Sequence, residues 1–522
     1  MDDWGAMLVR IDELRQGYEQ ISAMRRLSSC PRVGRAFMCL EFLVIMSLVC
    51  MVRAEAADTL VSIDRTTGDW SDLGMGVPSA EDDADPSQNP YAVFTYVPTV
   101  GRDLDEITIA VRETGSQTVT LGDIRLTKPL TEAIPFLVAG PKLYEYGAMD
   151  GTFPSTGRLN GDQGGIWCHP IKLMNQFEYE ILEQGHSPFR VQGSAAQFAH
   201  DFASCQFTFN NYDLNIRRRD FVSEEAPALF SLLTLRNQTD RRRTLDVRFS
   251  CVVNIRPSYA SGLPNGRDVL DYRDGLVSAY DSEMASQWGV VFGSHQRPVN
   301  HRIDDNNAVL TYSVTLPAQG ETTLRFLILG EHKDGVEVAR SRFRSILRQA
   351  PEMLTRKQRF YADRILGGVR FECSNQAVND AFYCAKANVM MSVMDLRPGY
   401  PASFLAAGFP IYTWLFGCDS LYSTAGVAAG GFDEAAHGTL ECLLHYADLK
   451  KQGPHEVASN GRLLGWDHIQ ETPQLVLACW KHFRWTGDTR FLKRAYPVCK
   501  ESVAQVRGSA DRDRDGYLEG PR

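Results

Sequence analysis

The stretch Trp414-Leu415-Phe416-Gly417-Cys418-Asp419-Ser420 is the most informative part of this chain of 522 residues. Two short stretches follow it between segments of helical period, Pro454-His455-Glu456-Val457 and Gln470-Glu471-Thr472-Pro473-Gln474. An aromatic ring stacks on the C–H face of a sugar, and carboxylates accept paired hydrogen bonds from neighbouring hydroxyls. The three stretches therefore predict the wall of one sugar pocket. The expected substrate-binding residues are Trp414, Asp419, His455, Glu456, Gln470 and Glu471.

The chain around these stretches has the period of helices from about residue 332 onward. Val378, Ala381, Ala385 and Val389 recur at three- and four-residue steps, which is typical of an amphipathic helix. Two later helices carry start signals. We expect Thr472 to cap one helix, with Pro473 in its first turn, and Asp488 to cap the next, which Pro497 interrupts and Gly508 ends.

The preceding part, from about 90 to 330, has the period of strands. Short runs rich in Val, Ile, Thr, Phe and Tyr alternate with turn residues, as in 91–97, 107–111, 244–253 and 323–329. The strands are too many and too close together for helical crossovers between parallel strands. The sequence therefore predicts an antiparallel sandwich followed by paired helices.

Length and charge limit the class of protein. A chain of 522 residues is too long for one ordinary core, so two domains are expected. The apolar fraction of 44% and the charged fraction of 23% are those of a globular protein. A formal net charge of −9 gives no reason to expect a nucleic-acid partner.

The N-terminus resembles a targeting segment. Arginines between 25 and 35 precede the apolar run 42–52, and Ala54-Glu55-Ala56 supplies small residues where a signal peptidase cleaves. The run is shorter than the roughly 20 residues of a membrane-spanning helix, so we expect cleavage before Ala57, an extracytoplasmic location and no stable membrane span. An uncleaved anchor and a buried strand remain as alternatives.

The cysteines suggest no cofactor. Nine of the 12 lie outside the N-terminal segment, without the paired spacing of a zinc or redox motif. Cys442 and Cys479 fall on the apolar faces of expected helices, so the simplest interpretation is that they are small buried hydrophobic residues. No cofactor is therefore expected to be required.

From Gly157 onward the chain resembles bacterial glycogen-debranching-type (amylo-α-1,6-glucosidase-like) proteins, which are related to glucoamylase and other six-hairpin glycosidases. The resemblance rests on blocks that occur in the family's order: 165–173, 408–422, Asn460-Gly461, 470–474, 485–488 and 513–520. It implies an N-terminal antiparallel β-supersandwich followed by an (α/α)6 toroid.

The resemblance also implies a reaction. In inverting glycosidases one carboxylic acid protonates the leaving oxygen, while a second carboxylate on the opposite face activates water. By position in the motif, Asp419 is expected to accept from two sugar hydroxyls and Trp414 to form a wall of the pocket. Cys418 stands where glucoamylases have arginine, which removes a fixed cation and a donor.

The toroid is expected to be incomplete, because the residues after about 370 supply about five helices of the twelve. In the family the general base lies near the last helices, so its position is missing from this sequence. Glu519 stands where the loop of the general acid begins and is the candidate acid. A binding or capping carboxylate is the alternative. We therefore expect a fragment that lacks the general base.

The last segment also contains a candidate calcium loop. Asp511, Asp513 and Asp515 followed by Gly516 match the opening of a loop in which alternate side chains converge on a hard cation. Arg522 occupies the twelfth position, where the closing glutamate is absent. A solvated acidic turn is the alternative.

Three functions remain open at this point. The first is an inverting, exo-acting α-glucosidase or debranching-type glycoside hydrolase that acts on oligosaccharides or α-glucans. The second is a non-catalytic or degenerate carbohydrate-binding relative, and the third is a glycoside phosphorylase. The expected domains are an N-terminal extension and signal peptide (1–56), the β-supersandwich (57–331), linker helices (332–370) and the first part of the toroid (371–522).

Overall fold

A computed structural model describes the chain from residue 135 to 519 with a few internal gaps, together with the backbone of three short strands before it. The signal segment, most of the strand expected at 91–97 and Arg522 lie outside the described residues. The described ranges are 97–98, 107–111, 117–121, 135–155, 163–193, 195, 197–211, 213–259, 261–465, 468 and 470–519.

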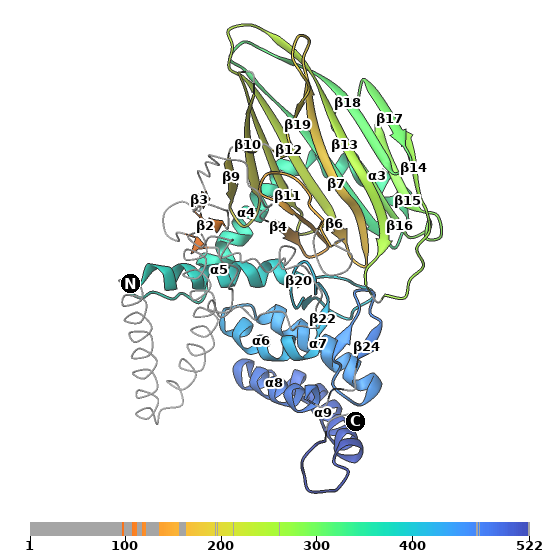
Figure 1. The fold of residues 1–522 in the computed structure, drawn as a ribbon. Helices are drawn as coiled ribbons and strands as arrows, with labels where there is room; N and C mark the ends of the chain where they lie inside the picture. The colour runs from red at the N-terminus through yellow and green to blue at the C-terminus, as the bar shows by residue number, and fades with distance from the viewer. Residues whose placement is uncertain are drawn as a thin grey trace, which may run out of the picture.

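Two antiparallel sheets form a sandwich, which is the first part of the fold along the chain (Figure 1). One sheet has the order β14-β15-β16-β19-β12-β11-β10-β9. Its strands are β9 (Gln197–His200), β10 (Cys205–Asn211), β11 (Leu214–Val222), β12 (Ala228–Asn237), β14 (Asp268–Arg273), β15 (Leu276–Asp281), β16 (Trp288–Ser294) and β19 (Glu321–His332).

The second sheet has the order β17-β18-β13-β7-β6-β5-β4, and β8 pairs with β7. Its strands are β4 (Pro135–Gly140), β5 (Leu143–Ala148), β6 (Gly165–Cys168), β7 (Ile171–Leu182), β8 (Phe189–Arg190), β13 (Arg243–Pro257), β17 (Asn300–Asp304) and β18 (Asn307–Leu316). A separate three-stranded sheet contains β1 (Val97–Pro98), β2 (Ile107–Val111) and β3 (Gln117–Leu121).

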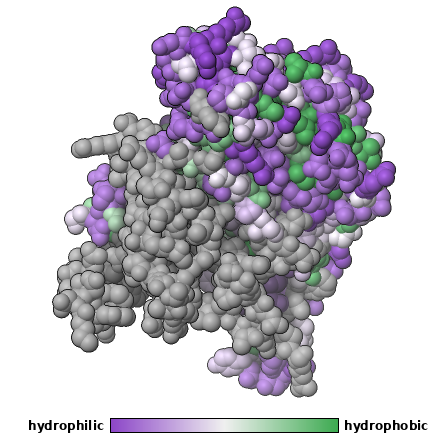
Figure 2. Space-filling view, turned by 45° about the horizontal axis from the view of Figure 1, so that its top comes forward, coloured by the Kyte–Doolittle hydropathy of each residue, from purple (hydrophilic) through white to green (hydrophobic). Residues whose placement is uncertain are grey.

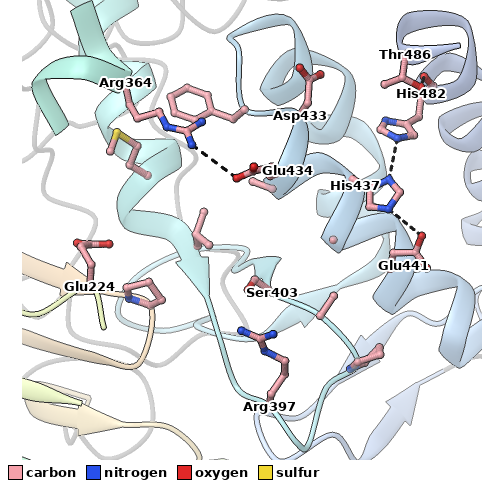
Figure 3. A pocket seen from close by; sticks show the side chains of 18 of the residues that line it. Glu224, Arg364, Arg397, Ser403, Asp433, Glu434, His437, Glu441, His482 and Thr486 are labelled. Carbon is pink, nitrogen blue, oxygen red and sulfur yellow. Dashed lines mark hydrogen bonds and ion pairs between the residues drawn. The ribbon is translucent and has the colours of Figure 1, made fainter. Parts of the chain in front are cut away.

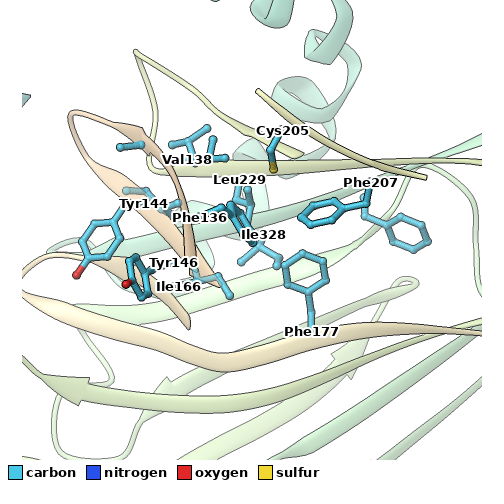
Figure 4. Packing of buried hydrophobic residues seen from close by; sticks show 14 of the residues in the cluster. Phe136, Val138, Tyr144, Tyr146, Ile166, Phe177, Cys205, Phe207, Leu229 and Ile328 are labelled. Atoms are coloured by element: carbon cyan, nitrogen blue, oxygen red, sulfur yellow. The ribbon is translucent and has the colours of Figure 1, made fainter. Parts of the chain in front are cut away.

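The sandwich forms because each long strand has one apolar face. Burial alternates residue by residue along the first half of β13, as strand geometry requires when one face packs and the other is wet. The buried faces meet in one core, where Phe136, Phe177 and Phe207 pack beside Leu229 and Ile328 (Figure 4). The visible outer surface of the sandwich is mainly hydrophilic (Figure 2).

An ion cluster lies inside this core. Arg218 donates to Asp220 at 2.6 Å and to Glu145 at 2.9 Å, and none of the three side chains is exposed. The guanidinium also lies 4.4 Å from the ring centroid of Phe177. Burial, and then the Asp220 charge, raise the pKa of Glu145 well above its usual range.

Helices follow the sandwich, as the change of period predicted. The helices are α3 (Val336–Arg348), α4 (Ala350–Leu366), α5 (Gln376–Ser392), α6 (Gly417–Ala429), α7 (Asp433–Lys450), α8 (Glu471–Thr486) and α9 (Thr489–Ala510). The short strands among them are β20 (Val393–Met394), β21 (Phe404–Leu405), β22 (Leu415–Phe416), β23 (Glu456–Val457) and β24 (Leu463–Gly465). The order of an antiparallel sandwich and then helices is confirmed.

Three expectations about α8 and α9 were wrong: the cap at Thr472, the interruption at Pro497 and the end at Gly508. Helix α8 begins at Glu471, so Thr472 lies inside it and its hydroxyl accepts from the Gly453 amide at 2.9 Å. Helix α9 does begin after the Asp488 cap, but it continues through Pro497 and past Gly508. Its buried stripe, which includes Ala495 and Val506, packs on the rest of the chain, and this packing outweighs the local cost of proline and glycine.

The sandwich shares its core with the first helices, whereas Leu440 of α7, Leu475 of α8 and Phe491 of α9 belong to a second buried cluster. Phe382 and Met390 of α5 belong to the same buried cluster as the sheet residues. The Lys357 ammonium of α4 is buried and donates to the Val222 carbonyl at 2.8 Å. The Cys442 and Cys479 side chains are buried, as expected. The sandwich and the helical part therefore pack directly on one another.

Candidate functional site

The three sequence stretches meet in a small sheet. Leu415 pairs with Val457, and Phe416 pairs with Glu456, so β22 and β23 are adjacent. The amide of Gly417, the first residue of α6, donates to the His455 carbonyl at 2.7 Å. A Cβ at Gly417 would overlap the Pro454 carbonyl, so only glycine fits there. Local pairing therefore places the starts of α6 and α8 side by side.

Trp414 is held on the inner side of this cluster. Its indole is 4% exposed, and Nε1 donates to Oε1 of Glu456 at 2.8 Å. The ring lies between Tyr259, with ring centroids 6.0 Å apart, and Phe416, 5.9 Å away. Trp414 therefore orients the Glu456 carboxylate and supports Tyr259, while little of its own surface is open to a ligand.

Tyr259 is a residue of this cluster that the sequence did not indicate. It comes from the sandwich, in the connection between β13 and β14, and its side chain is 52% exposed. Neighbouring residues hold this connection against the helical part. The Ser258 and Ser459 hydroxyls share a hydrogen bond, and the Asn460 side chain donates to the Ser261 carbonyl at 2.9 Å. A lone tyrosine in a loop rich in serine and glycine carries no periodic signal.

Glu471 lies at the centre of the cluster. Its side chain has no exposed surface, and Oε1 accepts from Nδ1 of His455 at 2.8 Å. Nδ1 of His468 lies 3.8 Å from the same oxygen. Within the described part of the chain Oε2 has no hydrogen-bond partner. The carboxylate therefore fixes the His455 tautomer with the proton on Nδ1 and leaves Nε2 able to accept.

His455, His468 and Glu471 offer the donor set of a zinc site, but their geometry does not fit one. A metal lies close to the plane of each imidazole that binds it, at about 2.0–2.1 Å. The two rings are stacked with centroids 3.8 Å apart and an angle of 18° between their planes. Nearly parallel stacked rings cannot both point at one ion, so this arrangement is a hydrogen-bonded cluster.

Asp419 and Gln470 lie at the outer edge. Asp419 is exposed in the first turn of α6, and its carboxylate has no hydrogen bond to the other residues that the structure describes. Gln470 is also exposed, and its side chain donates to the Cys418 sulfur at 3.6 Å. Burial, and then the Glu471 charge, raise the pKa of the Cys418 thiol. Cys418 therefore supplies a neutral group where the resembling family has a cation.

Glu519 and the acidic loop lie together after α9. Carboxylate oxygens of Asp511, Asp513 and Asp515 lie within 4.8 Å of one another. The Gly516 amide donates to Asp511 at 3.3 Å, and Oε2 of Glu519 accepts from the Arg512 amide at 2.9 Å. The oxygens have the spacing that a hard cation can use. Glu519 participates in this turn as a hydrogen-bond acceptor.

Comparisons with known proteins support the fold. No family model and no curated protein matches the sequence. A solved structure from the human microbiome, described as a kojibiose phosphorylase, matches with a TM-score of 0.52 and 11% identity, over 77% of this chain and 58% of that one. This likeness shows the fold alone, an antiparallel β-sandwich followed by helices of the toroid type. A bacterial glucoamylase complexed with acarbose matches with a TM-score of 0.45 and 8% identity, over 72% and 60%. The chain thus spans about three fifths of each.

No helix within the described ranges is both long and apolar enough to cross a membrane. The apolar run at 42–52, on which the expected export rests, lies outside those ranges.

Proposed function

We propose that the chain is a carbohydrate-active protein that binds α-linked glucose saccharides at the cluster around Glu471. One observation supports this proposal: an exposed aromatic ring, Tyr259, stacks on Trp414, whose Nε1 donates to the Glu456 carboxylate in the same small sheet that carries His455, the partner of Glu471. An apolar ring next to hydrogen-bond acceptors is the combination that a pyranose requires.

Each group has a role in this proposal. The Asp419 carboxylate accepts from sugar hydroxyls, since its oxygens are exposed. Nε2 of His455 accepts a hydrogen bond from a further sugar hydroxyl, because the ring proton lies on Nδ1, which donates to Glu471. The Tyr259 ring stacks on the sugar, and Gln470 lies at the rim.

For the reaction we propose inverting, exo-acting hydrolysis of α-glucans, with Glu519 as the candidate general acid. A general base has not been identified among the described residues, so non-catalytic carbohydrate binding is the alternative. The likeness to a protein described as a kojibiose phosphorylase favours a second alternative, in which phosphate replaces the activated water.

The experiment is calorimetric titration with maltose, isomaltose and panose, followed by NMR of the products with and without phosphate. Binding together with release of the β-anomer supports the proposed hydrolysis. Release of the α-anomer indicates retention and contradicts inversion, and turnover only with phosphate supports the phosphorylase. If none of the three sugars binds, the proposed function is wrong.

Two further proposals concern calcium and export. We propose that Asp511, Asp513 and Asp515 bind Ca²⁺, because their oxygens are already gathered. Calorimetric heat on titration with calcium that disappears in Asp513→Asn supports this proposal, and the absence of heat contradicts it.

We also propose an extracytoplasmic location. N-terminal sequencing of exported protein tests it, and we expect Ala57 to be the first residue.

A further inference from the structure

A cavity lies between the sandwich and the helices. Its volume is about 620 Å³, and Figure 3 shows residues from the sandwich and from the helical part around it. The cavity meets α8 at His482 and Thr486, whereas the candidate site contains Glu471 at the start of that helix. At 1.5 Å per residue, His482 lies about 16 Å along the helix from Glu471. The cavity is therefore separate from the candidate site.

Acidic side chains outnumber basic ones around this cavity. Among the residues that line it, the two arginines already have partners, because Arg364 pairs with Glu434 at 3.6 Å and Arg397 pairs with Asp395 at 2.7 Å. The carboxylates that line it are Glu224, Asp433, Glu434, Glu441 and Asp488. This excess of negative charge disfavours an anionic ligand.

Most of these carboxylates also have partners. Glu224 pairs with Lys357 at 2.9 Å, Glu441 pairs with Arg494, and Asp488 caps α9. Little uncompensated charge therefore remains to replace the hydration of a cationic ligand. Each carboxylate still has lone pairs that can accept from a hydroxyl. The lining thus favours a neutral ligand with several hydroxyl groups.

Two histidines in the wall leave one acceptor unused. Nε2 of His437 lies 3.2 Å from a carboxylate oxygen of Glu441, so the proton belongs on that nitrogen. Nδ1 of His437 then accepts from Nε2 of His482, 3.1 Å away, and Nδ1 of His482 carries no proton. His482 is 6% exposed, and this nitrogen has no hydrogen-bond partner in the described chain. Burial lowers the pKa of both histidines, consistent with neutral rings.

Apart from Ser403 and Thr486, the remaining side chains of the lining are apolar. Phe360 of α4 is 41% exposed, and Met390, Val393 and Phe432 complete that side. An exposed aromatic ring offers a surface for the C–H face of a sugar. The volume lies in the range of about 300–1,000 Å³ that small-molecule sites occupy.

We propose that this cavity is a second saccharide site, which takes a neutral mono- or disaccharide between the sandwich and α7. The ligand stacks on Phe360 and donates a hydroxyl hydrogen to Nδ1 of His482. This goes beyond the proposed function, because it assigns a second binding event to residues that the first site does not contain.

The test is calorimetric titration of the full chain with maltose, and then with glucose 1-phosphate as an anionic probe. We expect two binding events for maltose. His482→Phe keeps an aromatic ring but removes the Nδ1 acceptor. It should weaken maltose binding in the cavity about fivefold to tenfold, as the loss of one buried hydrogen bond does. Phe360→Ala, at a partly exposed position, should weaken the same event. Glu456→Gln should weaken only the other.

His445→Phe is the matched control, since His445 is an exposed histidine of α7 that does not line the cavity. Both maltose events should be unchanged in it, and glucose 1-phosphate should not occupy the second site. A single event that only Glu456→Gln weakens overturns this proposal and leaves the proposed function standing. A single event that only His482→Phe and Phe360→Ala weaken supports the cavity and contradicts the proposed function. Occupation of the cavity by glucose 1-phosphate as tightly as by maltose contradicts the argument from charge.

Discussion

Glu145 in the sandwich and Glu471 in the helical part are both fully buried, yet their surroundings differ. Glu145 shares the Arg218 guanidinium with Asp220, and aromatic rings surround that guanidinium. Glu471 instead contacts His455 and His468, whose side chains are 26% and 46% exposed. The first carboxylate belongs to a closed network, and the second connects the interior with the surface. The comparison shows that burial alone does not identify a functional carboxylate.

Removal of the Arg218 cation should have the largest effect. Arg218→Met leaves the buried carboxyl groups of Asp220 and Glu145 without their cation and should lower the free energy of unfolding by about 3–5 kcal/mol. Urea denaturation followed by circular dichroism measures it. Arg217→Met is the control, because Arg217 lies on the surface and pairs with Glu321, where the expected loss is below about 1 kcal/mol. Equal stability of the two variants would contradict a structural role for the cluster.

Neutralisation of Glu471 should affect ligand binding more than stability. Glu471→Gln keeps the shape but replaces a charged acceptor of the His455 proton by a neutral one, so maltose affinity at this site should fall about tenfold. Calorimetry measures the affinity, and thermal denaturation confirms that the fold is retained. Glu501→Gln, on the exposed side of α9, should leave the affinity unchanged. An unaltered maltose affinity in Glu471→Gln would contradict a role of Glu471 in ligand binding.

The pH dependence of stability should distinguish Glu145. Its pKa in the folded protein is raised above the ordinary value of 4.5, so the folded form holds a proton that the unfolded form has lost. This contribution is complete below pH 4.5 and is lost as the pH rises through the folded pKa. Glu145→Gln, which resembles the protonated acid, should flatten that decline in denaturation measured at a series of pH values. A parallel decline in variant and wild type would show that other groups cause it.

Loss of the Tyr259 ring should have the smallest effect. Tyr259→Ala removes one stacking surface that is 52% exposed, so maltose affinity should fall about threefold to tenfold and stability should hardly change. Tyr259→Phe should retain most of the affinity. Tyr496→Ala, at an exposed tyrosine of α9, is the control. Full maltose affinity in Tyr259→Ala would contradict a contribution of the sandwich to the binding site.

Much of the candidate site could be predicted because its residues lie in three short stretches. Adjacent strands bring Phe416 and Glu456 together, and the helices that follow carry Asp419 and Glu471. The burial of Trp414 and the stacking of His468 could not be predicted, because both depend on contacts between loops. The cap expected at Thr472 failed for a related reason, since its hydroxyl bonds to Gly453 across the cluster.

By itself, the sequence determined the order of sandwich and helices, since a period of two or of 3.6 records which face of each segment is buried. Only the tertiary structure decided that Tyr259 stands beside Trp414 and that His437 meets His482 at the wall of the cavity. Those contacts join residues far apart in the chain. They depend on how whole elements pack, which no local pattern encodes.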